Sequence, residues 1–361
     1  MNSQTNQSNR DKNFNELKNV LQSKIVLPKE SSETGVIELT NEEHEKLVSF
    51  WETLISLYEE DKFIILFRGQ KKQILENVLS SSFQDEAGKL LCKIFYFGDK
   101  AKHFFEYPNN SQDSYLRTID DTSDDTFNFI FDQIHTILAT NYGGDEGIKT
   151  EFKLSNIEFT NFFSKLDNKG NFINLINNVK NNKESERERI RDYYLFILHN
   201  FGRNFKKKSL FVSTSEDKAE AYKYAIHTKN NKSSIPDKKS VIFLYIVPRP
   251  LYKHGINAEI SKEFYQDYER QGFPTYSREI HKQEEVAIKG TLFPQYILGL
   301  YDLESENFIV NPYIFKKKNL QDFNILKGLY VNQDKFQARI KDTNLKVYVR
   351  KTNDMYRDEL T

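Results

Sequence analysis

The pattern of apolar and polar positions predicts a polar N-terminal arm followed by a folded domain. Residues 1–38 are rich in Asn, Gln, Ser and Lys, so we expect a flexible arm with one short helix. A capping box then begins at Thr40, with Glu43 three residues later, and apolar residues follow at helical spacing. This pattern predicts a helix that ends near Glu60.

The strongest strand signals are two continuous apolar runs, Phe63–Phe67 and Val241–Val247, which are typical of buried central strands. Between them, residues 71–205 have a mostly helical pattern. Shorter strand patterns and one further helix are expected after residue 208, over 210–213, 217–227, 285–288 and 296–301. The interpretation is one α+β domain over residues 39–305, with a helical insertion over about 71–205. Residues 306–361 are expected to form a β-rich C-terminal extension of the same domain.

Composition narrows the functional classes. Lys+Arg and Asp+Glu balance at 52 each, which argues against a globally basic nucleic-acid-binding surface. Cys92 is the only cysteine, and the seven histidines are scattered, so we expect no disulfide and no metal cofactor. Cys92 lies in an apolar run and is expected to be a packed core residue. The polar N-terminus and the short apolar runs predict a cytoplasmic protein with no membrane partner.

Three segments carry candidate chemistry. Arg68 and Gly69 follow the first buried strand, where a guanidinium suits a pyrophosphate and a glycine permits close approach of a ligand. Ser213 begins a run of three hydroxyl residues between a strand and a helix. Gln283 and Glu285 open a later strand and point to the same face, because strand residues two apart do so.

Each segment taken alone has an ordinary structural explanation. The arginine could simply mark the end of a strand, and a carboxylate at the start of a strand is common. In the second segment, Thr214 or Ser215 would be the N-cap of the following helix. This leaves Ser213 unexplained.

The order of the three segments resembles the arginine–serine–glutamate class of ADP-ribosyltransferases. The resemblance covers residues 63–70 and 209–301, and the Phe-Arg-Gly-Gln run is also similar to the motif that names the FRG domain of bacterial defence proteins. It implies a split β-sandwich core and NAD as the substrate. One departure is the spacing between Arg68 and Ser213, which are 145 residues apart, further than is usual in that family. The resemblance therefore implies a large helical insertion between them.

The resemblance also implies roles for the residues. Arg68 would hold the phosphates or the nicotinamide ribose of NAD, the Gly69 backbone would bind the carboxamide, and Ser213 would orient Glu285. Glu285 would then bind the ribose and stabilise the cation. Further contributions are expected from the Gln283 amide toward the incoming nucleophile, from Thr214 and Ser215 as support, and from an aromatic partner of nicotinamide among Phe211, Tyr222 and Tyr224.

The acceptor of ADP-ribose stays open between RNA, DNA and protein. Gln283, where related enzymes with arginine acceptors have Glu, disfavours arginine. Lysine runs at 206–208 and 316–318 and the aromatic residues of 262–282 would suit a nucleic acid. The biological settings expected are a bacterial toxin, a toxin–antitoxin pair with its antitoxin as partner, antiviral defence, and an effector injected into the cytosol of a target cell. Two alternatives are an NAD glycohydrolase and a non-catalytic module that senses a ligand or a phage.

Overall fold

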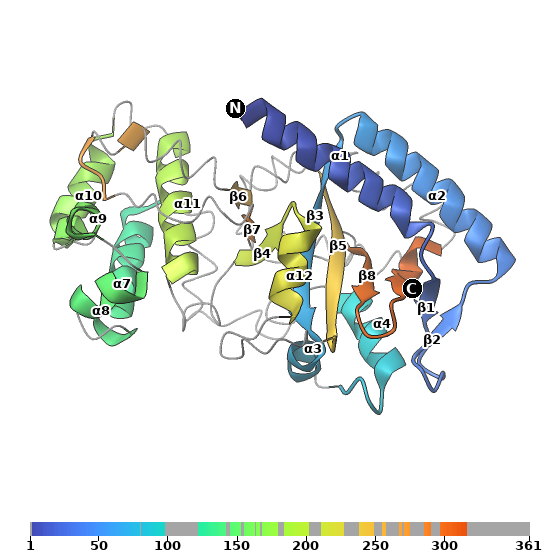
Figure 1. Ribbon diagram of the computed structural model, residues 1–361. Coiled ribbons are helices and arrows are strands. Elements are labelled where there is room, and N and C mark those ends of the chain that lie inside the picture. Colours follow the sequence, from blue (N-terminus) through green and yellow to red (C-terminus); the bar gives the residue numbers. More distant parts are fainter. Residues whose placement is uncertain are drawn as a thin grey trace.

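Two long strands, β3 (Phe63–Lys71) and β5 (Ser240–Pro248), pair antiparallel along their whole length at the centre of the fold. They contain the two apolar runs that the sequence predicts as buried strands. The strands described form one sheet in the order β2-β1-β9-β8-β5-β3-β4-β7-β6 (Figure 1). The computed structural model describes residues 2–79, 81–97, 122–141, 145–152, 155–162, 164–166, 168–179, 184–201, 211–226, 238–248, 255–257, 267–268, 271–274, 285–289 and 297–315.

The sheet continues beyond β5 through strands from both ends of the described chain. β8 (Ile297–Asp302) pairs antiparallel with β5, and β9 (Phe308–Val310) pairs antiparallel with β8. β1 (Ile25–Pro28) pairs parallel with β9, and this is the one parallel pair among the described strands. β2 (Val36–Glu38) pairs antiparallel with β1 and forms the edge of the sheet. The α+β class is confirmed by this mixed, mostly antiparallel sheet and its covering helices.

Three short strands complete the other side of the sheet, namely β4 (Phe211–Ser215), β7 (Glu285–Lys289) and β6 (Gly255–Asn257). β7 pairs antiparallel with β4 over five residue pairs and with β6 over three. β3 and β4 are joined in the ladder through one pair, Phe67 with Ser215. The sheet is therefore weakly connected at the boundary between its central strands and this short-stranded part.

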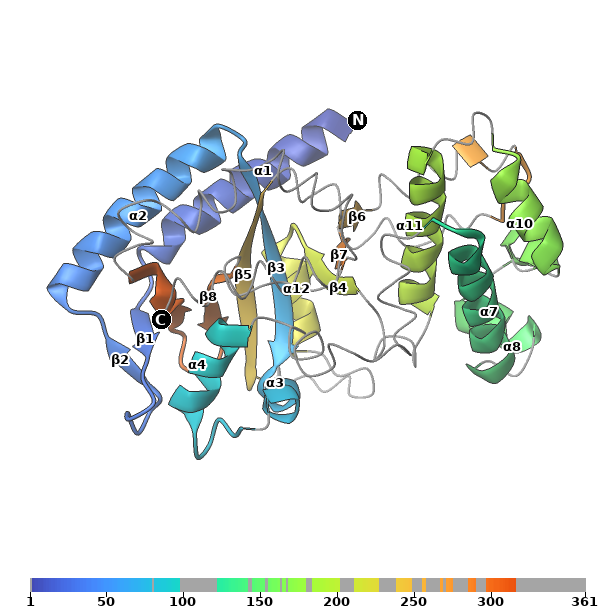
Figure 2. The ribbon, with the colours of Figure 1, turned by 180° about the vertical axis from the view of Figure 1, so that it is seen from behind.

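Helices cover both faces of the central strands. The capping box is confirmed, since Thr40 Oγ1 accepts from the Glu43 N–H and α2 (Asn41–Glu59) follows directly. α2 packs on the face of Phe63, Ile65 and Phe67 together with α12 (Lys218–Ile226). The opposite face, which carries Ile64 and Leu66, is covered by α3 (Lys72–Leu79) and α4 (Ala87–Phe97), as the view from behind shows (Figure 2).

The expectation that residues 1–38 form an arm separate from the folded domain is wrong. Residues 2–20 form the helix α1 (Asn2–Val20), and Leu17 is fully buried against α2. The Trp51 indole N–H donates to the Leu17 carbonyl oxygen at 2.7 Å. Phe14 and Leu17 are three residues apart on one face of this helix, and the surrounding polar composition obscured that short apolar stripe.

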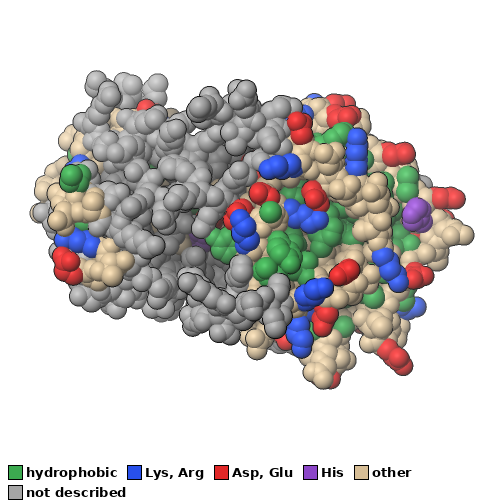
Figure 3. Space-filling model, in the orientation of Figure 1, with side chains coloured by type: hydrophobic (Ala, Val, Ile, Leu, Met, Phe, Trp, Pro, Cys, Tyr) green, Lys and Arg blue, Asp and Glu red, His purple; other side chains and the backbone are tan. Residues whose placement is uncertain are grey.

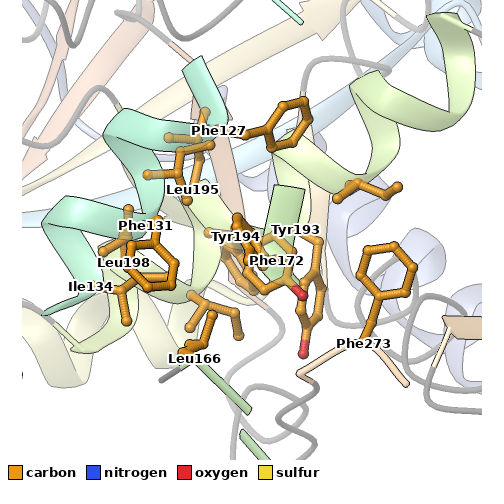
Figure 4. Packing of buried hydrophobic residues seen from close by; sticks show 14 of the residues in the cluster. Phe127, Phe131, Ile134, Leu166, Phe172, Tyr193, Tyr194, Leu195, Leu198 and Phe273 are labelled. Carbon is orange, nitrogen blue, oxygen red and sulfur yellow. The ribbon is translucent and has the colours of Figure 1, made fainter. Parts of the chain in front are cut away.

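The helical insertion falls into two parts. α3 and α4 belong to the cover of the sheet, whereas α7, α9, α10 and α11 pack around a core of their own beside β7, and Figure 4 shows part of that core. Ala287 of β7 belongs to this second core, so the helical unit is docked on one face of β7. Its elements are α7 (Asp124–Asn141), α8 (Asp145–Phe152), α9 (Asn156–Phe162), η1 (Ser164–Leu166), α10 (Lys169–Asn177) and α11 (Glu184–Phe201).

The C-terminal extension is described only through β9 and the short helix η6 (Pro312–Phe315), so the strand signal at 347–349 lies outside the described residues.

Cys92 in α4 is a free, half-buried thiol rather than a fully buried core residue. Burial raises the pKa of this thiol, with a smaller contribution from the charge of Glu30. Among the described residues, none of the helices has the length and apolar character needed to cross a membrane.

Candidate functional site

The sheet order brings the three sequence segments together. β4, which carries Ser213, lies between β3, which carries Arg68, and β7, which begins at Glu285. In the β4–β7 ladder, Ser215 is opposite Glu285 and Ser213 is opposite Ala287. Gln283 lies outside the described residues, so its expected place on the face of Glu285 stays a prediction.

Arg68 spans the weak junction between β3 and β4. Its Nη1 donates a hydrogen bond to the Ser213 carbonyl oxygen at 2.6 Å. In the β3–β4 ladder the only residue pair is Phe67 with Ser215. The Arg68 side chain therefore adds a contact between the two strands beyond that pair, at the Ser213 carbonyl oxygen. The charged donor fixes the strand of the serine motif beside the strand of the arginine motif.

Ser213 and Glu285 lie on the same face of the sheet. Side chains alternate along a strand, and Val212 and Val286 enter the core on the α3–α4 face, whereas Ala287 enters the core of the helical unit. Ser213 and Glu285 therefore point toward the helical unit. The Glu285 side chain retains 13% of its exposure there, so a carboxylate lies at the boundary between the sheet and that unit.

A residue that sequence reasoning missed connects the two. His199, in the last turns of α11, places Nε2 2.6 Å from Ser213 Oγ and 3.4 Å from Glu285 Oε1. Its side chain is only 4% exposed. The sequence signal is weak, because a lone histidine that ends an apolar run, Tyr193–Leu198, does not reveal a partner in a distant strand.

The geometry favours one form of the imidazole. A carboxylate oxygen accepts but does not donate, so the contact with Glu285 is favourable when the His199 nitrogen that faces it carries a hydrogen. In serine hydrolases the serine gives its proton to a bare histidine nitrogen, and the acid contacts the other ring nitrogen. Here Ser213 and Glu285 approach the same nitrogen, so the three residues do not form a hydrolase relay.

Thr214 and Ser215 support the local structure. The buried Thr214 hydroxyl donates to the Val286 carbonyl oxygen at 2.6 Å, and Ser215 Oγ accepts from the Asp217 N–H at 3.0 Å. The interpretation of Thr214 or Ser215 as the N-cap is wrong. Asp217 accepts from the Ala219 N–H at 2.8 Å, directly before α12 begins, and its charge suits the positive end of the helix.

Gly69 is required by packing. A Cβ at this position would lie 1.8 Å from the carbonyl oxygen of Ala221, because the backbone of α12 crosses β3 here. The expectation that Gly69 leaves room for a ligand is therefore wrong on this side of the strand. The space is filled by a helix, which positions α12 directly over the end of β3.

Of the three aromatic candidates, Tyr224 is the one whose hydroxyl pKa is affected by the charge of Glu285. Tyr224 is 54% exposed as a residue, but desolvation of its hydroxyl raises the pKa of that group to about 12, and the charges of Glu285 and Glu220 contribute. The Tyr224 hydroxyl therefore stays protonated and can donate. Tyr222, on the same helix, lines a cavity that does not contain Glu285. The side chain of Phe211 lies outside the described residues.

A cavity lined by described residues lies elsewhere. It has a volume of about 610 Å³ between α1, the start of α12 and the β8–β9 turn, with Glu16, Lys218, Tyr222 and Tyr301 in its wall. Figure 3 shows this face, where basic and acidic side chains intermix around apolar atoms. Arg68, Ser213 and Glu285 do not line that cavity. The contacts of Arg68, Ser213 and Glu285 join chemically distinct groups, whereas charged residues of the cavity wall form ion pairs with one another, Glu16 with Lys218 and Glu306 with Lys238.

Comparison of the chain with family models, curated proteins and solved structures found no match in any of the three. Within the described part of the chain, no group of three or more His, Cys, Asp or Glu side chains is arranged to hold a metal ion.

Proposed function

We propose that this chain is an NAD-dependent mono-ADP-ribosyltransferase that transfers ADP-ribose to a macromolecule. One observation carries the proposal. Three segments far apart in the sequence meet in one chain of contacts, from Arg68 to Ser213, and from Ser213 through His199 to Glu285. A purely structural use of each motif does not require the arginine, the serine and the glutamate to converge.

The sheet supports the finer fold assignment. A split β-sandwich core needs two sets of strands that separate near the substrate, and here β3 and β4 separate beyond the Phe67–Ser215 pair. The separation begins beside Arg68 and Ser213. We therefore propose an ADP-ribosyltransferase-like core in which this junction borders the dinucleotide.

The proposed reaction breaks the bond between ribose C1′ and the nicotinamide nitrogen. Nicotinamide leaves with the bonding electron pair, and C1′ acquires the positive character of an oxocarbenium ion, as in glycoside hydrolysis. The Glu285 carboxylate is suited to bind a ribose hydroxyl and to stabilise that charge. Arg68 would attract the pyrophosphate. An acceptor nucleophile then bonds to C1′ and loses its proton.

The proposed acceptor is a nucleic-acid base or a protein side chain other than arginine. Gln283 would present a neutral amide to the nucleophile, which does not provide the second carboxylate suited to a guanidinium. The biological role that we propose is that of a cytoplasmic toxin or effector in a toxin–antitoxin or phage-defence system, with the antitoxin as a partner in the first case.

The experiment that tests this proposal measures the transfer of a label from NAD to protein, RNA or DNA. The protein is incubated with NAD labelled in the adenylate part and with separate protein, RNA and DNA fractions. The comparison is wild type against Glu285→Gln, with Glu52→Gln on the exposed face of α2 as the control. Label that becomes attached to one fraction in the wild type and the control, but not in Glu285→Gln, supports the transferase.

The other outcomes identify the alternatives. NAD that is cleaved while all label stays free supports an NAD glycohydrolase, in which water accepts ADP-ribose at the same site. NAD that stays intact with every fraction, although the wild type is folded, rejects both enzymes and leaves a binding module.

A further inference from the structure

We infer that His199 is a positioning residue that holds the Ser213 hydroxyl and the Glu285 carboxylate in place, and that the helical insertion therefore completes the active site. The inference rests on the proposed function, which it deepens. It assigns a role to a segment, α11, that contains none of the three motif residues.

His199 is held firmly by the helical unit. The residues before it on α11, Leu195 to Leu198, are almost completely buried in the core that also contains Ala287 of β7. The buried Tyr194 hydroxyl donates to the Pro274 carbonyl oxygen at 2.9 Å, which ties the same helix to a second segment. A side chain that projects from so closely packed a helix has little freedom, and it behaves as part of the site wall rather than as a removable cover.

The contacts show what this imidazole does. Nε2 lies 2.6 Å from Ser213 Oγ and 3.4 Å from Glu285 Oε1. With its hydrogen on Nε2, the imidazole can donate to either oxygen, and when it donates to Ser213 the serine's own hydrogen is directed elsewhere. A donor at Oε1 restrains the rotation of the Glu285 carboxylate, which holds the carboxylate in one orientation toward a ribose hydroxyl. His199 acts through these two residues and touches no reacting atom.

This role gives a physical reason for the long spacing between Arg68 and Ser213. The residues between them build the helical unit that carries His199, and the chain returns from α11 to β4 only twelve positions after the histidine. The insertion is therefore placed where its last helix can reach the serine and the glutamate at once. A helical unit that served only as a surface extension would not need a buried polar group at this junction.

Two substitutions separate positioning from packing. In His199→Gln, one amide nitrogen with two hydrogens can donate to both acceptors, whereas His199→Leu fills a similar space and donates to neither. We expect His199→Leu to lower kcat for NAD consumption by about 10- to 100-fold, with KM changed less than about threefold, as is usual for the loss of an orienting partner. His199→Gln should retain kcat within about fivefold of the wild type. His44→Leu, on exposed α2, is the matched control.

The outcomes distinguish the two levels of the proposal. A folded wild type without any NAD turnover overturns the proposed function itself. An active wild type with equal kcat in His199→Leu and His44→Leu overturns the positioning role, and so does an equal loss in the folded Leu and Gln variants. If the Leu variant does not fold, the Gln variant decides, because kcat near the wild-type value supports positioning and a large loss contradicts it.

A spectroscopic measurement tests the contact without using activity. The ring nitrogen signal of His199 is identified by its absence in His199→Gln. It should move in Ser213→Ala and in Glu285→Gln, while the His44 signal stays in place. A His199 signal that is unchanged in both variants would show that the imidazole does not hold these groups, whether or not the protein turns over NAD.

Discussion

Arg68 donates from Nη1 to the carbonyl oxygen of Ser213 across 2.6 Å, and this bond joins two strands that otherwise pair at a single position. We expect Arg68→Lys to lower the free energy of unfolding by about 1.5–3 kcal/mol, the range for a hydrogen bond from a charged group. A lysine lacks the planar fork that reaches this acceptor. NAD turnover should fall at least about tenfold.

Urea unfolding and NAD consumption measure the two effects. Arg189→Lys is the control, because Arg189 forms a half-exposed ion pair with Asp267 in which a lysine can substitute. If Arg68→Lys is as stable and as active as this control, the strand junction does not depend on the guanidinium.

Gly69 provides a second prediction at the same junction. In Gly69→Ala the new methyl group would meet the Ala221 backbone at 1.8 Å, and a backbone atom cannot move aside as a flexible side chain can. We expect a loss of at least about 3 kcal/mol in the free energy of unfolding, at the upper end for overpacking. Gly170→Ala, in α10, meets only the Asn168 side chain at 3.2 Å and should change stability by less than about 1 kcal/mol. Chemical denaturation that finds the two variants equally stable would contradict the close packing of α12 on β3.

Local patterns determined the elements that the sequence could predict. The capping box at Thr40 and the apolar run from Phe63 involve neighbours in the chain, and the structure confirms both. The predicted cap of α12 at Thr214 or Ser215 is wrong because three hydroxyl residues and Asp217 compete within five positions, and Asp217 is the residue that caps the helix.

The missed parts of the site depend on contacts between distant segments. His199 meets Ser213 only because the core of the helical unit docks on β7, and no spacing in the sequence encodes that docking. The sequence indicates that a glycine is needed at position 69 but not why, because a glycine that admits a ligand and a glycine that admits a helix look identical in a sequence. The roles of Gln283 and Glu285 in catalysis stay predictions.

The N-terminal helix provides a prediction about stability. Leu17 is fully buried, and its carbonyl oxygen accepts from the Trp51 indole, so α1 contributes to the core on which β3 rests. We expect Leu17→Ala to lower the free energy of unfolding by about 2–5 kcal/mol. Leu21→Ala, at a partly buried residue directly after the same helix, should have a smaller effect. Equal, negligible effects in thermal unfolding would restore the interpretation of residues 1–38 as a separate arm.

Tyr224 separates the contribution of a ring from that of a hydroxyl. Burial first, and then the charges of Glu285 and Glu220, raise its pKa to about 12, so the hydroxyl stays protonated between pH 7 and pH 10. If its ring stacks on nicotinamide, Tyr224→Ala should raise KM for NAD by about 2- to 10-fold, which corresponds to a stacking energy of about 0.5–1.5 kcal/mol. Tyr224→Phe should stay within about twofold over that pH range. Steady-state kinetics with Tyr222→Ala as control would assign the contact to Tyr222 if only that variant responds.

Lys72, directly after β3, gives a stability prediction with a defined pH dependence. Its Nζ lies 2.8 Å from both Asp302 Oδ1 and Glu304 Oε2, and the lysine and Asp302 are only 12% and 13% exposed. Burial lowers the pKa of Lys72, but the hydrogen bonds and charges of the two carboxylates outweigh it, so the net pKa is raised. We expect Lys72→Met to lower the free energy of unfolding by about 1–3 kcal/mol at pH 8, because a largely buried carboxylate loses its cation.

The sign of the pH effect follows from the raised pKa. A group that binds its proton more tightly when folded stabilises the protein fully below its unfolded pKa, which is about 10.4 for lysine. The stabilisation is then lost as pH rises through the higher folded value. The difference between wild type and Lys72→Met should therefore be constant from pH 7 to pH 9 and shrink above about pH 10.4. In Lys46→Met, which removes an exposed pair with Glu42, the difference should stay below about 0.5 kcal/mol. Unfolding curves in which the Lys72 difference grows between pH 9 and pH 11 would require the lysine to be neutral in the folded protein, against the two carboxylates that surround it.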